Sequence, residues 1–285
     1  NPHNKLIIGP WDHGGKSNIS PFNIGPSGFD HQGELLKFFD YHLQDQETGI
    51  ADEAPIHYFT MGEEQWKASH SWPPEATRIS YYFEAERQLT TTHPTNEVAH
   101  DQYVVNPMVG TGHQSRWDTL VGQSLPTPYA DRPQKHDQLL SYTSDPLEQD
   151  MEVTGHPIVT IYLSANTTDA NVFAYLEDID ETGEATYVTE GLLRALHRKI
   201  IDSPMHFPKG VPYRTFTRQN ASPLIPDRVA KLSFDLLPTS YQFKQGHRIR
   251  LSITGADKDH FALLPGENPT FTIYRSKQYS SQLDL

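Results

Sequence analysis

The sequence predicts a mainly β protein, in which a jelly-roll-like β-sandwich in the C-terminal part follows a short strand–helix–strand unit. Two observations support this prediction. Helical spacing of apolar residues is confined to one segment near the start of the chain, and short segments that alternate apolar and polar residues fill the chain from about residue 77 onward. At 285 residues the chain is also longer than a single core usually requires, so we expect two unequal domains, residues 1–76 and 77–285.

The chain opens with a short apolar run that ends at a loop containing a histidine. Residues 6–8, Leu-Ile-Ile, are typical of a short buried strand. Gly9 and Pro10 end this strand, because proline lacks the N–H that a sheet ladder needs and glycine tolerates unusual backbone angles. His13 therefore lies just after a strand, where a rigid scaffold often presents catalytic side chains. The same position also suits an ordinary loop histidine.

An amphipathic helix and a second strand follow. Asp30 is placed to cap the start of the helix, and Gly49 lies beyond its end. We expect the apolar face of the helix to pack against a sheet. This face is formed by Leu35, Leu36, Phe39 and Leu43. Residues 54–62 are rich in β-branched and aromatic side chains, which predicts a strand, and strands connected through a helix usually lie parallel.

The rest of the chain consists of short alternating segments separated by turn residues. In one of them Ile249, Leu251 and Ile253 alternate with polar or charged residues, which predicts one buried and one solvent-exposed face. Two antiparallel sheets packed face to face would bury such strands. Further strand candidates are residues 78–84, 156–165, 172–180, 230–237 and 269–275.

Two segments of this β part need separate interpretation. Residues 190–199, "EGLLRALHRK", fit either a helix or an irregular strand. Residues 175–184, "YLEDIDETGE", have the composition of a calcium-binding loop but not its ligand spacing. A β-hairpin turn at residues 181–183 is the prediction for this segment.

Composition and charge exclude several classes of partner and site. The formal net charge of -13, without a stripe of Lys and Arg, argues against a nucleic-acid partner. No apolar run approaches the ~18 residues of a membrane span, so no membrane partner is expected. The absence of cysteine excludes disulfides, thiolate metal sites and a cysteine nucleophile. No metal site is predicted, because His3, Asp12, His13 and His31 match no tight ligand spacing.

The first residues, "NPHNKL", are neither a Met start nor a signal peptide with a basic region and an apolar core. We therefore expect the natural N-terminus to lie upstream. The compartment stays open, with a soluble, cytoplasmic protein as the expectation.

A histidine that acts as a general base needs a nucleophile within hydrogen-bond reach. In α/β-hydrolases the nucleophilic serine lies in a Gly-x-Ser-x-Gly turn, and the triad follows the chain order serine, acid, histidine. The segments "GKSNI", "GPSGF" and "GQSLP" each lack the final glycine at the required position, so this chain contains no such turn. If His13 is a triad base, the serine and the acid must therefore precede this chain.

The segment "LIIGPWDHGG" resembles the Gly-Pro-Trp-x-His motif that carries the catalytic histidine in the cocaine esterase and X-prolyl dipeptidyl-peptidase family of serine hydrolases. The similarity continues through "LLKFFDYHL" and "IHYFTMGEEQW". The β part is similar to the C-terminal jelly-roll domain of that family, in "LLSYTSDPLEQDMEVTGHPIVTIYLSA", "VFAYLEDID", "TEGLLRALHR" and "GHRIRLSITGAD". The resemblance implies that residues 1–76 are the incomplete C-terminal part of an α/β-hydrolase catalytic domain, and that residues 77–285 are the jelly roll.

The resemblance also implies a function. His13 matches the triad histidine of a serine hydrolase that cleaves an ester or amide bond through an acyl-enzyme, without a cofactor. Asp12 occupies the variable place of the motif and is not assigned as the triad acid. The expected partners are a small-molecule ester or peptide substrate and the upstream hydrolase and cap domains of the same protein. This chain alone is expected to be inactive.

Three further side chains are candidates for the substrate pocket. Trp11 could form a wall beside His13, and Trp117 and Leu120, in a loop of the β part, could contact an acyl group. The alternatives are that Trp11 belongs to the core and that the loop packs on its own sandwich. Two other functions also stay open for the β part. One is carbohydrate binding through exposed aromatic side chains such as Trp117 or Tyr129, and the other is oligomerisation in a homo-oligomer.

Overall fold

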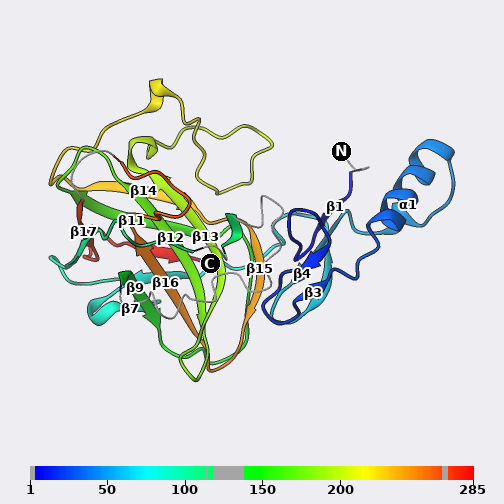
Figure 1. Cartoon of the computed structure of the whole chain (residues 1–285), viewed down its shortest axis with the longest axis horizontal. Coiled ribbons are helices and arrows are strands. Elements are labelled where there is room, and N and C mark those ends of the chain that lie inside the picture. Colours follow the sequence, from blue (N-terminus) through cyan, green and yellow to red (C-terminus); the bar gives the residue numbers. More distant parts are fainter. Residues whose placement is uncertain (1–3, 113–114, 118–137, 265–268) are drawn as a thin grey trace.

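The computed structural model describes residues 4–112, 115–117, 138–264 and 269–285, and it shows a small α/β unit joined to a larger β-sandwich (Figure 1). In the small unit, β1 (Leu6–Ile8) pairs in parallel with β4 (Ile56–Thr60), and β4 pairs antiparallel with β5 (Gln65–Ser69). β1 and β4 are connected through α1 (His31–Gln44), so the predicted parallel strand–helix–strand unit is confirmed. The same connection contains β2 (Ser17–Asn18), β3 (Gly25–Pro26) and the 3-10 helix η1 (Ile50–Asp52).

α1 begins and ends where nearby groups satisfy its free backbone atoms. The Asp30 carboxylate accepts a hydrogen bond from the Gly33 N–H at 2.8 Å, which confirms the predicted N-cap. The helix ends at Asp45, whose φ of 53° is left-handed. Aspartate tolerates this region because its short polar side chain can bond locally. Gly49 lies beyond this end, as predicted, and precedes η1 with a φ of 76°.

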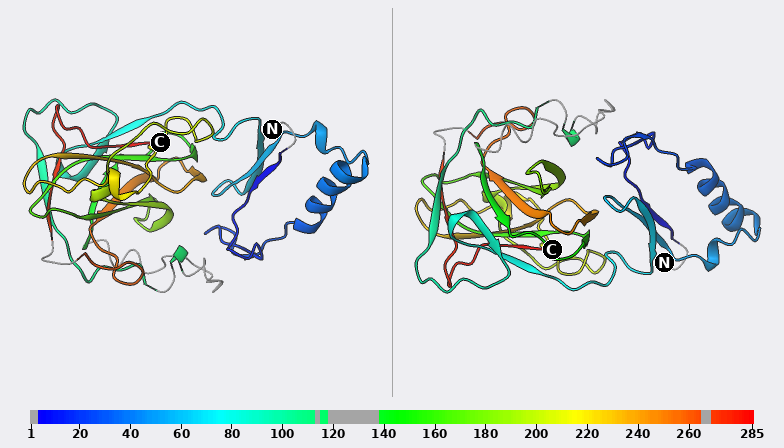
Figure 2. Two further views of the ribbon diagram at one scale, coloured as in Figure 1. Left: turned by 90° about the horizontal axis from the view of Figure 1, so that it is seen from above. Right: turned by 90° about the horizontal axis from the view of Figure 1, so that it is seen from below.

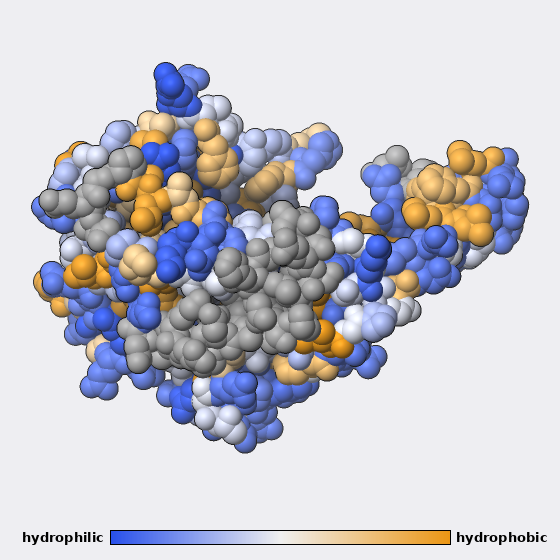
Figure 3. Space-filling model, viewed as in Figure 1, coloured by the Kyte–Doolittle hydropathy of each residue, from blue (hydrophilic) through white to orange (hydrophobic). Residues whose placement is uncertain are grey.

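The apolar face of α1 is largely exposed, so the expectation that it packs against a sheet is wrong for the described chain. No residue of α1 is buried. The exposed fractions are 57% for Leu35, 60% for Leu36, 49% for Phe39 and 75% for Leu43. Figure 3 shows apolar side chains gathered over this helix, at the end of the molecule away from the β-sandwich. Neither α1 nor another helix in the described ranges is long and apolar enough to cross a membrane.

Ion pairs tether α1 to the start of β1 and to the residue after η1. The Lys5 ammonium donates to Glu34 at 3.1 Å and also to Glu53, which accepts a further hydrogen bond from Lys37. Burial alone would lower the pKa of Lys5, but hydrogen bonds and charges from the two carboxylates raise it. Burial alone would raise the pKa of Glu53, but Lys37 and Lys5 outweigh this effect and lower it. Charged contacts therefore hold a helix whose apolar face lacks cover.

The larger part is a β-sandwich, which confirms the predicted mainly β fold class. Its strands follow one path in the order β13-β12-β16-β9-β7-β6-β18-β11-β17-β8, with β14 beside β11, and the path folds over on itself (Figure 2). Both halves contribute to one core, because Leu176 of β12 and Ile161 of β11 are fully buried in the same cluster. A separate ribbon of β10 and β15 lies on the side toward the small unit.

The strands of the sandwich have the following bounds. They are β6 (Ser80–Phe83), β7 (Gln88–Thr90), β8 (His100–Val104), β9 (Leu140–Ser144), β10 (Met151–Gly155), β11 (Ile158–Ala165), β12 (Asn171–Ile179), β13 (Ala185–Arg194), β14 (Ala230–Asp235), β15 (Thr239–Phe243), β16 (Arg248–Thr254), β17 (Thr270–Tyr274) and β18 (Gln282–Asp284).

Alternation of buried and more exposed residues is confirmed in β17 but is wrong for β16. In β16 the polar residues are also covered: Arg250 is 7% exposed and Ser252 is fully buried. The physical reason is a buried carboxylate on the neighbouring strand β12. Glu177 accepts hydrogen bonds from Arg250 Nε at 2.8 Å and from Ser252 Oγ at 2.5 Å. The polar residues of β16 therefore face a covered polar layer, in which hydrogen bonds replace solvent.

The structure also decides the two segments that needed separate interpretation. Residues 190–199 contain the end of β13 and a 3-10 helix at Ala195–His197, so the strand interpretation holds up to Arg194. The predicted hairpin turn is confirmed, since the Gly183 N–H donates to the Asp180 carbonyl at 3.0 Å. The Asp180 carboxylate accepts from the N–H groups of Thr182 at 2.8 Å and Glu184 at 2.9 Å. The Asp180 carboxylate therefore stabilises the turn.

Main-chain hydrogen bonds join the β4–β5 turn of the small unit to β15 of the sandwich. The Met61 N–H donates to the Ser240 carbonyl at 3.0 Å, and the Gln242 N–H donates to the Met61 carbonyl at 2.8 Å. Gly62 has a φ of 83°, and a Cβ at this position would lie 2.6 Å from the Gln242 carbonyl oxygen. This close approach requires glycine, so the sequence itself encodes the junction.

Candidate active site

The loop that carries His13 projects from the end of β1 and is closed by hydrogen bonds across it. At its base, the Ile19 N–H donates to the Pro10 carbonyl at 2.8 Å. Nearer the tip, the Asp12 N–H donates to the Ser17 carbonyl at 3.1 Å. These bonds make the loop a short, hairpin-like projection with His13 at its tip.

Asp12 organises the backbone around His13. Its carboxylate Oδ1 accepts hydrogen bonds from the N–H groups of Lys16 at 3.0 Å and Ser17 at 3.3 Å. Its main-chain carbonyl accepts from the Gly15 N–H at 3.0 Å. An aspartate that bonds backbone groups a few residues ahead stabilises a tight turn. Asp12 is therefore a structural residue of the loop.

His13 itself is exposed. No hydrogen bond or ion pair with another described residue engages its imidazole. An exposed imidazole on a braced loop can accept a proton at one nitrogen while the other donates to an acid. The described residues contain no group of three or more His, Asp or Glu side chains placed to hold a metal ion.

Trp11 lies in an aromatic cluster beneath the loop. Its ring centroid is 4.9 Å from that of Phe29, 4.4 Å from that of His31 and 5.7 Å from that of Trp66. A Cβ on Gly9 would collide with the Trp11 indole, so the glycine makes room for the ring. These contacts pack one side of Trp11 against its aromatic neighbours, while its intermediate exposure leaves part of the residue accessible beside His13.

The other two pocket candidates belong to the β part. The Trp117 ring meets the Phe261 ring edge-on at 5.1 Å, and Phe261 lies 5.0 Å from Phe173 of β12. These contacts place Trp117 on its own sandwich, and none of its described ring contacts involves the His13 loop. Leu120 lies outside the described residues, as does Tyr129. The pocket role of Leu120 and the carbohydrate-binding role of Tyr129 stay predictions.

Sequence reasoning missed two residues that brace the loop. Ser20 follows the loop closure and is fully buried, and its Oγ donates to Glu64 Oε1 at 2.6 Å. The same oxygen accepts from the Gly62 N–H at 3.0 Å. The two side chains are 44 positions apart, so no local pattern could pair them. The available signal was a carboxylate two residues after a glycine in a turn that follows a strand.

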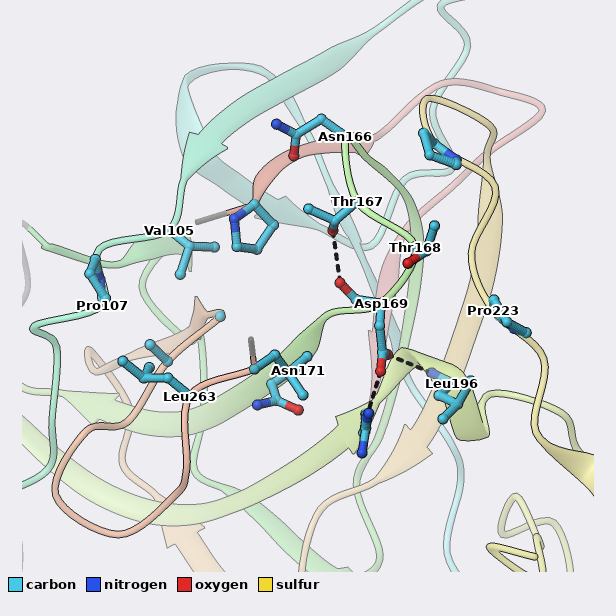
Figure 4. Close-up of a pocket in the computed structure, with 16 residues that line it drawn as sticks. Val105, Pro107, Asn166, Thr167, Thr168, Asp169, Asn171, Leu196, Pro223 and Leu263 are labelled. Carbon is cyan, nitrogen blue, oxygen red and sulfur yellow. Dashed lines mark hydrogen bonds and ion pairs between the residues drawn. The ribbon is translucent and has the colours of Figure 1, made fainter. Parts of the chain in front are cut away.

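A cavity of about 560 Å³ lies in the sandwich, away from His13, and Figure 4 shows its lining. All its lining residues lie after residue 104. Its charged groups satisfy one another, because Asp169 pairs with Arg194 Nε at 2.6 Å and accepts from the Leu196 N–H at 3.1 Å. The described lining includes no aromatic ring on which a sugar could stack. We therefore place the candidate chemistry at His13.

The sequence of this chain is similar to those of known proteins. A family model described as the X-Pro dipeptidyl-peptidase C-terminal non-catalytic domain matches residues 48–284. A Mycobacterium bovis protein named as a serine esterase is 48% identical over 285 residues, which are 100% of this chain and 45% of that protein. The cocaine esterase of Rhodococcus is 23% identical over 269 residues, 89% of this chain and 44% of that enzyme. The chain thus spans less than half the length of these relatives.

A solved structure shows the same fold. The crystal structure of an aminopeptidase from a marine sediment Thaumarchaeota archaeon has a TM-score of 0.77 at 19% sequence identity, and the match covers 99% of this chain and 49% of that chain. The family match starts after the His13 loop and after α1, so it covers η1, β4 and β5 of the small unit and the β part that follows. On this match, the chain belongs to the family of the X-Pro dipeptidyl-peptidase C-terminal non-catalytic domain.

Proposed function

We propose that this chain is the C-terminal part of a serine hydrolase and that His13 is the general base of the catalytic triad. Residues 1–76 would be the end of an α/β-hydrolase domain, and residues 77–285 a jelly-roll domain. The observation that carries the proposal is the exposed imidazole on a braced loop directly after β1, within Gly-Pro-Trp-Asp-His. The triad order places the serine and the acid upstream of this loop.

In this mechanism His13 moves one proton twice in each half-reaction. Its unprotonated nitrogen takes the proton of the serine hydroxyl while the serine oxygen attacks the carbonyl carbon of the substrate. The imidazolium then gives the proton to the leaving alcohol or amine, and the acyl-enzyme forms. A water attacks the acyl-enzyme in the same way, and His13 returns the proton to the serine. Exposure of the imidazole leaves both nitrogens accessible for these partners.

We also propose that the upstream hydrolase domain covers the apolar face of α1. Four large apolar side chains on this face are 49% to 75% exposed. Ion pairs of Glu34 and Lys37 tether the helix to the small unit. Contiguous apolar surface of this kind usually marks an interface. The relatives provide a candidate for the cover, since more than half of their length lies outside the matched region.

The proposed substrate is a small ester or a peptide amide. The names of the two relatives, serine esterase and cocaine esterase, favour an ester. Trp11, Trp117 and Leu120 remain the proposed contributors to the acyl pocket. Of these, Trp11 lies two residues before His13 in the chain and would act from beneath the loop.

The test is hydrolysis of p-nitrophenyl acetate by four samples: the full-length protein, His13→Ala, His206→Ala and this chain alone. His206 is an exposed histidine of the β part and serves as the matched control. We expect a loss of about 10⁴-fold or more in kcat for His13→Ala, full activity for His206→Ala, and none for the isolated chain. A full-length His13→Ala enzyme with wild-type kcat would refute the proposal.

A further inference from the structure

We propose that Glu64, in the turn between β4 and β5, positions His13 for catalysis through its hydrogen bond to Ser20, so that Ser20 and Glu64 are positioning residues. This inference rests on the proposed function. It assigns to the β domain, through its contact with this turn, a part in placing the catalytic histidine.

The His13 loop contacts the turn through Ser20. The loop closes at the hydrogen bond between the Ile19 N–H and the Pro10 carbonyl, and Ser20 is the next residue along the chain. Ser20 has no exposed surface, and its Oγ donates to Glu64 Oε1 at 2.6 Å. A hydrogen bond to a carboxylate is stronger than one between neutral groups. Glu64 therefore fixes one end of the loop, while β1 fixes the other.

Glu64 is held in an unfavourable backbone conformation. Its φ of 59° is left-handed, a region that residues with a side chain seldom adopt. Its N–H donates to the Thr60 carbonyl at 2.8 Å, and its Oε1 also accepts from the Gly62 N–H at 3.0 Å. Its other oxygen, Oε2, is buried with no hydrogen-bond partner among the described residues. Backbone strain and an orphaned carboxylate oxygen in one residue point to a role beyond the stability of the turn.

Hydrogen bonds join the turn to the sandwich. Main-chain bonds join Met61 to β15, and the Thr60 hydroxyl hydrogen-bonds the Ser240 hydroxyl at 2.8 Å. On the loop side, the Phe22 ring lies 6.0 Å from the ring of Tyr241 in β15. Contacts therefore run without a break from β15 through the turn to Ser20 and the His13 loop. No described group of the β domain contacts the imidazole. The β domain instead fixes the β4–β5 turn, and Glu64 of this turn fixes the His13 loop.

A purely structural brace would show the same contacts, so the test must separate positioning from stability. The experiment measures kcat, KM and the melting temperature of the full-length enzyme with p-nitrophenyl acetate. The variants are His13→Ala, Ser20→Ala, Glu64→Ala and Glu64→Gln. The matched control is Glu63→Ala, because Glu63 is the neighbouring carboxylate of the same turn but pairs with Lys67 instead of the loop.

We expect Ser20→Ala and Glu64→Ala to lower kcat about tenfold to a hundredfold with KM nearly unchanged, as loss of alignment does. Glu64→Gln should recover most of kcat, because its amide oxygen can accept both hydrogen bonds. Glu63→Ala should keep the wild-type kcat. Ser20→Ala removes a single oxygen, so it provides the test even if Glu64→Ala does not fold.

The variants distinguish failure of the positioning proposal from failure of the proposed function. If His13→Ala abolishes activity but Ser20→Ala and Glu64→Ala keep kcat within twofold, the positioning proposal is overturned and the proposed function stands. If His13→Ala keeps activity, the proposed function itself fails. Equal losses of kcat in Glu64→Gln and Glu64→Ala would also contradict positioning through the hydrogen bonds that Glu64 accepts.

Discussion

The exposed face of α1 leads to a prediction whose result depends on how much of the protein is present. Leu36 and Leu43 are 60% and 75% exposed, and their spacing of seven residues places them on the same side of the helix. Truncation of either leucine to alanine in this chain alone removes little buried surface, so the free energy of unfolding should change by less than about 0.5 kcal/mol. If an upstream domain covers them, each truncation should cost about 2–5 kcal/mol in the full-length protein.

The assay is urea unfolding at neutral pH, followed by circular dichroism, for Leu36→Ala and Leu43→Ala in both contexts. Val98→Ala is the control, since Val98 is an apolar residue of the β part with 84% exposure and should be neutral in both. Equal effects of the leucine variants in the chain alone and in the full-length protein would refute the reasoning. Concentration-dependent unfolding of the chain alone would instead indicate that a second copy covers the face.

Two further predictions concern charges. Arg250→Met leaves the fully buried Glu177 without its cation and should cost about 3–5 kcal/mol in urea unfolding, whereas a cost below about 1 kcal/mol would show that the pair is solvated. The pKa of Glu53 is lowered in the folded state, so its stabilising effect is present above the unfolded pKa of about 4.3 and is lost as the pH falls through the lower folded value. The wild-type chain should therefore lose more stability than Glu53→Gln between pH 6 and pH 3, and parallel curves would contradict this.

Features that depend on local pattern could be predicted from the sequence. The strand before His13, the Asp30 cap and the hairpin turn at residues 181–183 each follow from neighbouring residues. His13 could be proposed as the base because its motif, Gly-Pro-Trp-x-His, consists of five consecutive residues. The mainly β fold was predictable because alternation recurs in strand after strand.

Features that depend on pairs distant in the chain could not be predicted. The polar face of β16 reads as solvent-exposed, but Glu177 on β12 covers it by pairing with Arg250, 73 positions away. Likewise, Ser20 looks like an ordinary loop residue until the fold brings Glu64 to it. The helical pattern of α1 predicts its apolar face, but this pattern does not specify which surface covers that face.

The most direct test of the central claim is covalent labelling of the full-length protein by a fluorophosphonate, followed by intact mass and peptide mapping. We expect a single adduct on a serine outside these 285 residues, formed about 10³-fold or more slowly in His13→Ala. An adduct on a serine within these residues, or equally fast labelling of His13→Ala, would contradict the assignment of His13 as the triad base.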